Sequence, residues 1–526
     1  MHWKRYKELP LSEKRQETYY IVGLDLGNDS SAIAFYNFAD NKPEIIDLSG
    51  GYGRPTIPTV MQFISESKEW VFGEYAIQNL GVGKEITLYN LTERLGNHEY
   101  IDIDNKPVSI SYIFGLYIKE LMSNVKNINP KAEIAGIAVS VPSYLSNRAK
   151  EELQRAFKSA GYAKELICLI SDRECLFSYI FRDGITTGQK VFLIDYGARE
   201  VRGGVYTADG SGRFKSLSSL FEDTIGTGAA ENKVFELFSS YYTANNPIQS
   251  RSGLTETDKA LKGQLTAFTY QHKNLLFQKS IRNKSAKLYF NFAFPPFQQV
   301  IGEKDANKII EPFRRRFDKF ILHVLENSIE QKDEKVTAAD IDVVICSGGG
   351  FEMLWAKEAV TSLFPQSKLR VFKNSKAITA ESAAYAAAQA LGAAEGITAA
   401  VEDRHQLPVD IGLILRDGKD NKENFIPLAE YNSFWWQNHP GRYFILNESV
   451  HEDIPFKIWS RTPEGYTKIL SDTVIKGLPK RPKGTTRLKV QLKFSSDNEA
   501  AASVRDCGFG EMYPKTDFEQ EIVVKL

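Results

Sequence analysis

The chain has 526 residues, more than a single hydrophobic core usually supports, so we expect two or more domains. Its 66 Lys and Arg residues balance its 66 Asp and Glu residues, and the lack of a basic excess argues against nucleic acid as a partner. A hydrophobic fraction of 42% and a charged fraction of 25% are typical of an ordinary globular protein.

The composition also indicates a compartment. No apolar run approaches the ~20 residues of a membrane span. The segment Met1–Glu8 lacks the apolar core of a signal peptide, so we interpret residues 1–18 as a polar N-terminal extension. The cysteines, which follow neither disulfide nor metal-site spacing, are Cys168, Cys175, Cys346 and Cys507. We therefore expect no membrane partner and a reducing, cytoplasmic location.

The stretch Tyr20–Phe35 is an apolar strand that ends in Asp25 and Gly27, followed by small polar residues and a second apolar strand. This pattern is typical of a phosphate-handling hairpin, because Gly27 lets the backbone approach a phosphate closely. A carboxylate at the strand end, such as Asp25, can hold a hydrated Mg²⁺ ion. Taken alone, an Asp-x-Gly turn fits an ordinary hairpin equally well.

The next segments predict a strand–helix–strand unit. Residues Ile134–Pro142 form a nearly continuous apolar run, as in strands buried on both faces of a parallel sheet. A helix is expected over Asn147–Ala160, and a second strand over Leu166–Ile170. Before this unit, Ile110–Val125 places apolar residues at helical spacing.

A second segment repeats the pattern of an apolar strand that ends in Asp-x-Gly. Residues Val191–Gly197 read as an apolar strand that ends in Asp195 and Gly197, with Gly203–Thr207 as the returning strand. Gly226 lies in a further Gly-rich turn. Two such turns separated by a strand–helix–strand unit predict a duplicated fold whose halves face each other across a cleft.

Another glycine-rich turn lies near residue 350. After residue 400 the hydrophobic pattern of the chain changes. The buried strand Asp340–Cys346 leads into Ser347–Gly350 and a helix over residues 352–363, an arrangement typical of an anion or nucleotide cradle. From about residue 401 helical periodicity stops. Short alternating strands, such as Arg487–Phe494, then predict a small antiparallel all-β domain.

The order of these motifs resembles that of the Hsp70 (DnaK-like) chaperones, members of the actin and sugar-kinase ATPase superfamily. The stretches that carry the resemblance are Gly23–Ser31, Ala138–Arg148, Ile194–Gly197, Cys346–Leu354 and Lys476–Leu526. It covers about residues 19–526. It implies an α/β two-lobed actin-like ATPase domain, a duplicated ribonuclease-H-like fold, followed by an all-β sandwich that grips exposed peptide segments.

The resemblance also implies domain boundaries. After the extension of residues 1–18, a nucleotide-binding domain would span residues 19–400, with lobe I at about 19–200 and lobe II at about 201–400. A linker would occupy residues 401–411. Residues 412–526 would form a β-sandwich resembling the peptide-binding domain, without the α-helical lid, and we expect such a sandwich to release peptide faster.

By the same resemblance, Asp25 and Asp195 would hold a hydrated Mg²⁺ ion, and Asp172 and Asp195 would act in catalysis. The residues that it implies for binding ATP or ADP are Gly27, Asn28, Asp29, Ser30, Gly197, Gly226, Gly348, Gly349 and Gly350.

The chain departs from the family at catalytic positions. In the second phosphate loop, Gly197–Arg202, Glu200 replaces a threonine and Arg202 an aspartate. The segment that best matches the family's catalytic-lysine motif, Thr92–Gly96, lacks that lysine. Asp29 replaces another threonine and adds negative charge beside a bound phosphate. We therefore expect weak or lost ATP hydrolysis, with nucleotide binding retained.

Three further features bear on function. A substitute cation could come from an arginine, the candidates being Arg94, Arg199 and Arg202. The linker contains a single leucine, which puts ATP-driven coupling between the domains in doubt. The aromatic run Phe434–Trp436 lies near the expected peptide-contacting loops and fits either a binding platform or a packed core.

The sequence thus predicts an Hsp70-like chaperone that binds ATP or ADP with Mg²⁺ and recognises unfolded or extended peptide segments of client proteins. A co-chaperone or other partner protein is a further expected partner. The alternative is a pseudo-ATPase scaffold for protein interaction, motivated by Glu200, Arg202 and the missing lysine. A small-molecule kinase of the same superfamily is disfavoured by the β-rich C-terminal part.

Overall fold

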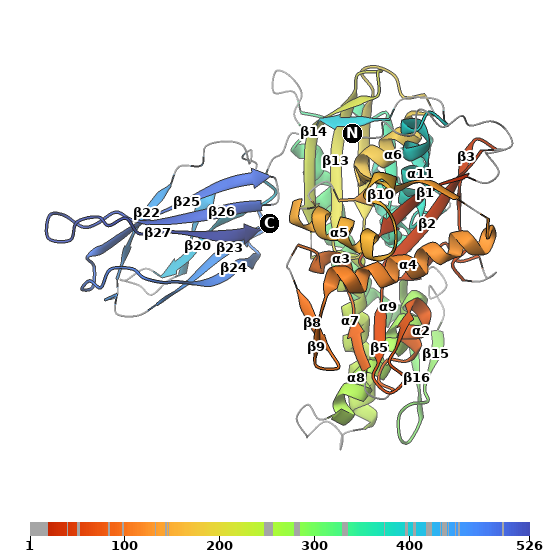
Figure 1. Ribbon diagram of the computed structural model, residues 1–526, viewed down its shortest axis with the longest axis horizontal. Helices are drawn as coiled ribbons and strands as arrows, with labels where there is room; N and C mark the ends of the chain where they lie inside the picture. The colour runs from red at the N-terminus through yellow and green to blue at the C-terminus, as the bar shows by residue number, and fades with distance from the viewer. Residues whose placement is uncertain are drawn as a thin grey trace. The chain divides into compact units, whose positions relative to one another are not determined.

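The computed structural model describes residues 19–526 apart from short stretches. The residues outside the description are 39, 50–52, 83–84, 97–98, 132, 143–144, 146, 183, 223, 247–255, 278–284, 329–334, 373, 395–397, 403–406, 417–422, 432, 434–438, 440, 448, 451–452 and 497–498. The expectations for residues 1–18 and for Phe434–Trp436 lie outside the described residues. The chain forms two compact units that divide after Glu402 (Figure 1).

The first unit contains a six-stranded sheet near its N-terminal end. Its strands are β1 (Tyr19–Leu26), β2 (Ser30–Asn37), β3 (Lys42–Ile45), β4 (Thr56–Pro58), β10 (Glu133–Val141) and β11 (Ile167–Ser171). The order is β11-β10-β1-β2-β3, with β4 paired to β2. Strands β11, β10 and β1 are parallel, β2 is antiparallel to β1, and β3 is antiparallel to β2. The last seven residues of β10 are buried, as expected for a strand covered on both faces.

A second six-stranded sheet has the same topology in its first five strands. Its strands are β12 (Lys190–Tyr196), β13 (Val201–Ala208), β14 (Arg213–Glu222), β17 (Val343–Ser347), β18 (Leu369–Val371) and β19 (Ala400–Glu402). The order is β18-β17-β12-β13-β14-β19. Strands β18, β17 and β12 are parallel, β13 and β14 continue antiparallel, and β19 runs parallel to β14. The matching order and directions indicate an internal duplication.

The helices of the first unit connect and cover these sheets. They are α2 (Gly73–Gln78), α3 (Leu91–Arg94), α4 (Ile110–Ile128), α5 (Asn147–Ser159), α6 (Asp172–Phe181), α7 (Thr227–Asn245), α8 (Glu256–Phe277), α9 (Glu303–Glu326), α10 (Leu354–Leu363) and α11 (Ile378–Ala390). Single 3-10 turns occur at Lys164–Leu166, Ala338–Asp340, Gly349–Glu352 and Gln366–Lys368. Helix α6 begins after Ser171, whose hydroxyl accepts a hydrogen bond from the Glu174 N–H and so caps the helix.

Helix α11 packs directly on the first sheet because both partners carry small residues (Figure 1). A Cβ atom on Gly23 of β1 would lie 2.2 Å from the Ala380 carbonyl oxygen and 2.2 Å from the Ala384 nitrogen. No real side chain fits at that distance. Gly23 is therefore required for the contact between β1 and α11.

Shorter strands complete the first unit. A three-stranded sheet consists of β5 (Met61–Ile64), β6 (Glu69–Phe72) and β7 (Glu85–Leu88), and two hairpins consist of β8 (Tyr100–Ile103) with β9 (Lys106–Ser109) and β15 (Ser285–Phe290) with β16 (Phe297–Gly302). No helix among the described residues combines the length and the apolar character needed to cross a membrane.

The second unit contains only strands among its described elements. They are β20 (Asp410–Arg416), β21 (Glu423–Ala429), β22 (Arg442–Leu446), β23 (Ile454–Arg461), β24 (Thr467–Ile475), β25 (Thr486–Ser496), β26 (Glu499–Asp506) and β27 (Glu519–Lys525). They form two antiparallel sheets, ordered β21-β20-β23-β24 and β22-β25-β26-β27.

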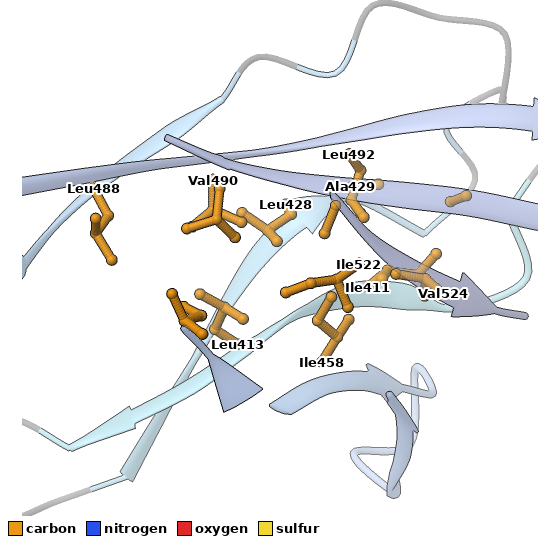
Figure 2. Close-up of a cluster of buried hydrophobic side chains, with 14 of the residues drawn as sticks. Ile411, Leu413, Leu428, Ala429, Ile458, Leu488, Val490, Leu492, Ile522 and Val524 are labelled. Atoms are coloured by element: carbon orange, nitrogen blue, oxygen red, sulfur yellow. The ribbon is translucent and has the colours of Figure 1, made fainter. Parts of the chain in front are cut away.

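Both sheets of the second unit contribute to one hydrophobic core (Figure 2). Ile411 and Leu413 of β20 and Ile458 of β23 come from one sheet, and Val490 of β25 and Val524 of β27 come from the other. On β27 buried residues alternate with more exposed ones, which is the period of two that a half-buried strand requires, and on β26 the same alternation is interrupted at Ser503, which is also buried.

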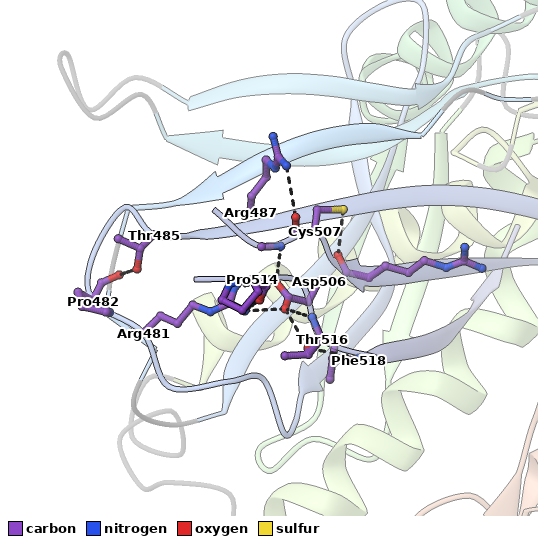
Figure 3. A network of polar contacts seen from close by, with 11 residues as sticks. Arg481, Pro482, Thr485, Arg487, Asp506, Cys507, Pro514, Thr516 and Phe518 are labelled. Atoms are coloured by element: carbon purple, nitrogen blue, oxygen red, sulfur yellow. Dashed lines mark hydrogen bonds and ion pairs between the residues drawn. The ribbon is translucent and has the colours of Figure 1, made fainter. Parts of the chain in front are cut away.

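A buried ion pair fixes the segment between β26 and β27 (Figure 3). The Arg481 guanidinium donates two hydrogen bonds of 2.8 Å to the Asp506 carboxylate and a third to the Pro514 carbonyl oxygen. Asp506 also accepts from the N–H groups of Gly508 and Thr516 and from the Thr516 hydroxyl. With 5% and 0% of their side chains exposed, Arg481 and Asp506 are stable inside the unit only because both are fully paired.

Most elements expected from periodicity are confirmed. Helix α4, the unit β10–α5–β11, and strands β12 and β13 lie within a few residues of their expected positions. The expected strand over Asp340–Cys346 begins at Val343, because Asp340 closes a 3-10 turn through hydrogen bonds with Thr337. The helix expected from residue 352 begins at Leu354, because Gly349–Glu352 forms a separate 3-10 turn.

Candidate functional site

The two aspartates selected from the sequence occupy equivalent places in the two sheets. Asp25 of β1 pairs with Ser140 on its parallel neighbour and with Ala32 on its antiparallel neighbour. Asp195 of β12 pairs with Ser347 on its parallel neighbour. Its antiparallel partner is Arg202, where the first sheet has an alanine.

The acidic groups of the site influence one another. Removal from water, followed by the negative charges of Asp195 and Asp172, raises the pKa of Asp25 to about 8. Removal from water also raises the pKa of Asp195 to about 6, although Arg202 acts in the opposite direction. The three carboxyl groups therefore lie close enough to repel one another, so a cation placed among them is stabilised.

Arg202 already supplies one positive charge to this cluster. Its Nη1 lies 2.7 Å from the Asp172 Oδ2, and the same guanidinium hydrogen-bonds the Glu200 carboxylate. Glu200 is 6% exposed, so its charge depends on this pairing. Asp172, which is the first residue of α6, is thereby held by the arginine.

A chain of polar contacts joins the second turn to the first. Arg199 Nε lies 3.8 Å from Glu200 Oε2 and 3.7 Å from Glu93 Oε1 on α3. Glu93 Oε1 in turn accepts a hydrogen bond of 2.9 Å from Asn28 Nδ2. Both turns thus contact Glu93, the first through Asn28 and the second through Arg199.

Asp29 also has cationic neighbours. Its carboxylate lies 3.7 Å from Lys273 Nζ on α8 and 3.9 Å from Lys376 Nζ. The negative charge that the sequence places in the first turn is therefore compensated within the chain. Ser30 is the first residue of β2 and pairs with Pro58 of β4.

The glycines expected to bind nucleotide are also required by close backbone packing. Gly348 has a φ of 92°, and a Cβ there would lie 2.4 Å from the Tyr196 carbonyl oxygen and 2.8 Å from Asp195 Oδ1. A Cβ on Gly350 would meet the Tyr196 ring at 2.2 Å. The turn after β17 thus lies directly beside Asp195 because it has no side chains there.

The remaining glycines of this set lie in or beside the turns. A Cβ on Gly27 would lie 2.5 Å from the Ser30 carbonyl oxygen, which explains the tight first turn. The second turn is closed by a hydrogen bond of 2.9 Å from the Gly197 N–H to the Glu200 carbonyl oxygen. Gly226 precedes α7, and a Cβ there would lie 2.4 Å from the Ala198 carbonyl oxygen.

Several residues of the site escaped the sequence analysis. They are Glu93, Glu231, Lys273, Lys376 and Glu352, which come from separate segments of the chain. For Lys273 the sequence does contain a signal. Its position continues the buried face of α8 through Leu265, Phe268 and Leu276, where helical spacing predicts an apolar residue. A lysine at such a position indicates a buried charge with a partner.

The donor set bears on which ions the site can hold. Among the described residues, no three His, Cys, Asp or Glu side chains are arranged to ligate one metal ion directly. Mg²⁺ commonly keeps several water molecules and binds proteins through one or two carboxylates. The pair Asp25 and Asp195, whose pKa values are raised by burial and by neighbouring carboxylates, fits such a hydrated ion.

Comparison with known proteins gives two kinds of match. Residues 42–203 match the C-terminal part of a family of unknown function (DUF5716), and residues 406–526 match a domain of unknown function (DUF8552). The chain is 21% identical over 521 residues to the chaperone protein DnaK of Thermosipho africanus, with 96% of this chain and 80% of the relative covered.

Other DnaK proteins match at similar levels. The chaperone protein DnaK of Thermotoga maritima is 22% identical over 98% of this chain and 81% of its own length. That of Mycoplasma mobile is 23% identical over 62% of this chain and 51% of its own length. The matches indicate a distant Hsp70-like relationship, and the mixed α/β unit followed by an all-β unit is consistent with a DnaK-like two-domain layout.

Proposed function

We propose that this protein is a DnaK-like chaperone that binds ATP or ADP with Mg²⁺ in its first unit and extended peptide segments in its second, with weak or lost ATP hydrolysis. The observation that carries the proposal is the equivalent placement of Asp25 and Asp195 in two sheets of matching topology. The distant similarity to DnaK over nearly the whole chain supports it.

In this proposal the two matching sheets are the cores of the two lobes of an actin-like ATPase. Residues 19–400 form the nucleotide-binding domain, residues 401–411 the linker, and residues 412–526 a β-sandwich. The expected start of lobe II near residue 201 coincides with the beginning of β13. The first strand of the second sheet, β12, begins earlier, at Lys190. The shared core of the two C-terminal sheets supports the sandwich assignment.

The nucleotide would lie with its phosphates between the turn at Gly27–Ser30 and the turn at Gly197–Glu200. Asp25 and Asp195 would hold the hydrated Mg²⁺ ion, which supplies positive charge to the phosphate oxygens. Gly348–Gly350 would border the adenosine, because they form the turn after β17, which lies directly beside Asp195.

Weak or lost hydrolysis follows from the engagement of Asp172. In the proposed role this carboxylate acts near the attacking water, but here it is bonded to Arg202 at 2.7 Å. A carboxylate that is held by a guanidinium is less free to orient water. Glu200 adds a second acidic group beside the same arginine.

Calorimetric titration of the full chain with ADP and Mg²⁺ tests the binding half of the proposal. We expect a saturable signal and a rise in unfolding temperature, because a ligand that binds only the folded state stabilises it. Asp25→Asn should reduce the part of the affinity that depends on Mg²⁺, whereas Asp102→Asn, at an exposed position on β8, should not. Absence of both heat and stabilisation at millimolar ADP would sink the proposal.

Fluorescence anisotropy tests the peptide-binding half. A labelled extended peptide rich in leucine should bind the full chain, and the same peptide with serine in place of leucine should not. Equal binding of the two peptides would contradict recognition of exposed apolar segments. The four free cysteines of the chain support a reducing, cytoplasmic setting for such an activity.

A further inference from the structure

Asp29, in the turn between β1 and β2, lies between two lysines from distant parts of the chain. Its Oδ1 is 3.7 Å from Lys273 Nζ, and its Oδ2 is 3.9 Å from Lys376 Nζ. Each carboxylate oxygen therefore faces a different ammonium group. Two lysines arranged around one small anionic group would hold a phosphate in the same way.

The lysine of α8 is not an ordinary surface residue. Only 7% of the Lys273 side chain is exposed, and its Nζ is also 2.6 Å from Glu231 Oε1 on α7 and 4.7 Å from the centre of the Tyr270 ring. A lysine so deeply buried is stable only where anionic partners compensate its charge. Asp29 and Glu231 are those partners, and they tie the first turn to helices α7 and α8.

Of the two carboxylates beside Lys273, Glu231 is the nearer, and Asp29 also faces Lys376. Burial opposes ionisation of Asp29, but Lys273 and Lys376 outweigh it and lower its pKa. Burial, and then the charge of Asp29, raise the pKa of Glu231.

Lys376 extends the contact to the turn after β17. A Cβ on Gly349 would lie 2.7 Å from Lys376 Cε, so the lysine stem passes directly over that glycine. The Lys376 Nζ is also 3.9 Å from Glu352 Oε2. The same side chain therefore touches two of the elements, Asp29 and Gly349, to which nucleotide binding is assigned.

We propose that Asp29 is an internal anion that closes the nucleotide site by pairing with Lys273 and Lys376. A phosphate-bearing ligand enters only when its phosphates displace the Asp29 carboxylate from these two lysines. We call Asp29, Lys273, Lys376 and Glu231 the Asp29 clasp. The proposal rests on the proposed nucleotide binding and adds a regulation to it. The ligand class is a nucleoside di- or triphosphate, because its phosphate oxygens are anionic like the carboxylate oxygens that they displace and can pair with the same two lysines.

Hydrogen exchange on the full chain without nucleotide tests the closing role. Asp29→Asn keeps the size of the side chain and removes its charge. It should speed exchange of the α8 amides around Lys273 about tenfold, because the local opening free energy falls when the buried pair is lost. The control is Glu236→Gln, which removes an exposed pair with Lys233 on α7 (2.7 Å) and should leave α8 unchanged. Unchanged exchange in Asp29→Asn would overturn the clasp.

Titration with ADP tests the competition. If Asp29 competes with the phosphates, Asp29→Asn should bind ADP about five- to tenfold more tightly than the unmodified chain, which is within the usual range of coupling between two binding events. Asp29→Glu retains the charge and should show no such gain. Equal or weaker binding by Asp29→Asn would overturn the competition.

The two measurements separate failure of the clasp from failure of the proposed function. If neither the unmodified chain nor Asp29→Asn binds ADP, nucleotide binding and the competition both fail. The exchange of α8 then still decides whether Asp29 holds this part of the unit closed, because that experiment contains no nucleotide.

Discussion

Asp25 in the first unit is half-buried and Asp506 in the second is buried, yet their pKa values move in opposite directions. Around Asp25, removal from water and the charges of Asp195 and Asp172 all raise the pKa, to about 8. Around Asp506, burial is outweighed by hydrogen bonds from Arg481, Gly508 and Thr516, which lower the pKa. One carboxyl lies among like charges, and the other among donors.

The difference separates a structural ion pair from a candidate functional group. A fully paired carboxylate such as Asp506 makes the fold depend on its charge. A carboxylate crowded by other acids lowers stability, and such groups gather at functional sites because a ligand or ion can relieve the repulsion. Asp195 is intermediate, since Arg202 compensates part of its repulsion and its pKa rises only to about 6.

Removal of Arg481 should have the largest effect. Arg481→Met leaves the Asp506 carboxylate buried without its counter-ion, and the free energy of unfolding of the second unit should fall by about 3–5 kcal/mol. Hydrogen exchange of the β25 and β26 amides in the full chain measures this loss. Arg505→Met, which removes an exposed pair with Glu519 (2.7 Å), should cost less than about 1 kcal/mol. Similar losses in both variants would contradict the prediction that the buried Arg481–Asp506 pair contributes more to stability than the exposed Arg505–Glu519 pair.

Arg202→Met should have the next largest effect. It leaves Asp172 and Glu200 as uncompensated acidic groups and should lower the free energy of unfolding of the first unit by about 2–4 kcal/mol. The loss is smaller than for Arg481 because 21% of the Arg202 side chain is exposed. Urea denaturation followed by exchange in β12 and β13 reports it. A loss no greater than that of Arg199→Met, at a more exposed arginine, would contradict the central place of Arg202.

Asp25→Asn should stabilise the first unit in a pH-dependent way. Because the folded pKa of about 8 lies above the unfolded value near 3.8, the contribution of Asp25 to stability is complete below pH 4 and is lost as the pH rises towards 8. Asparagine does not titrate, so the variant should gain about 1–3 kcal/mol at pH 8 relative to pH 4. Denaturation curves at the two pH values measure the gain.

Asp195→Asn is the internal comparison for this experiment. The folded pKa of Asp195 is about 6, so its contribution to stability is already lost above that pH. The gain in stability of Asp195→Asn between pH 6 and pH 8 should therefore be small. An equal gain for the two variants above pH 6 would show that Arg202 does not distinguish the two aspartates.

Acid should affect the second unit in the opposite sense. The folded pKa of Asp506 is below its unfolded value, so its stabilisation is present above about pH 4 and is lost as the pH falls through the folded pKa. Between pH 5 and pH 3 the second unit should lose about 1 kcal/mol from this group. Exchange of β26 measures the loss, and in Arg481→Met the dependence should be much weaker.

Much of the fold could be predicted because its signals are local. The continuous apolar run of β10 and the repeated strand-Asp-x-Gly pattern of β1 and β12 depend on residues that are neighbours in the sequence. The distant similarity to DnaK agrees with the expected resemblance. Individual site roles, domain boundaries and hydrolysis remain predictions.

The partners of the site could not be predicted for the opposite reason. Arg202 meets Asp172 across 30 positions, and Lys273 meets Asp29 across 244 positions of the chain. The charge of each residue is visible in the sequence, but which charges meet depends on tertiary packing. The sequence therefore indicated that Glu200 and Asp29 are unusual, without indicating that each is compensated.

The contact between Gly23 and α11 has a mechanical consequence. With Ala380 and Ala384 directly against the backbone of Gly23, strand β1 and helix α11 behave as one rigid body. Asp29 follows that strand and Lys376 precedes that helix, so the two move together. The contact with Lys376 is therefore the less mobile part of the Asp29 clasp, and the contact with Lys273 on α8 is the part that opens first.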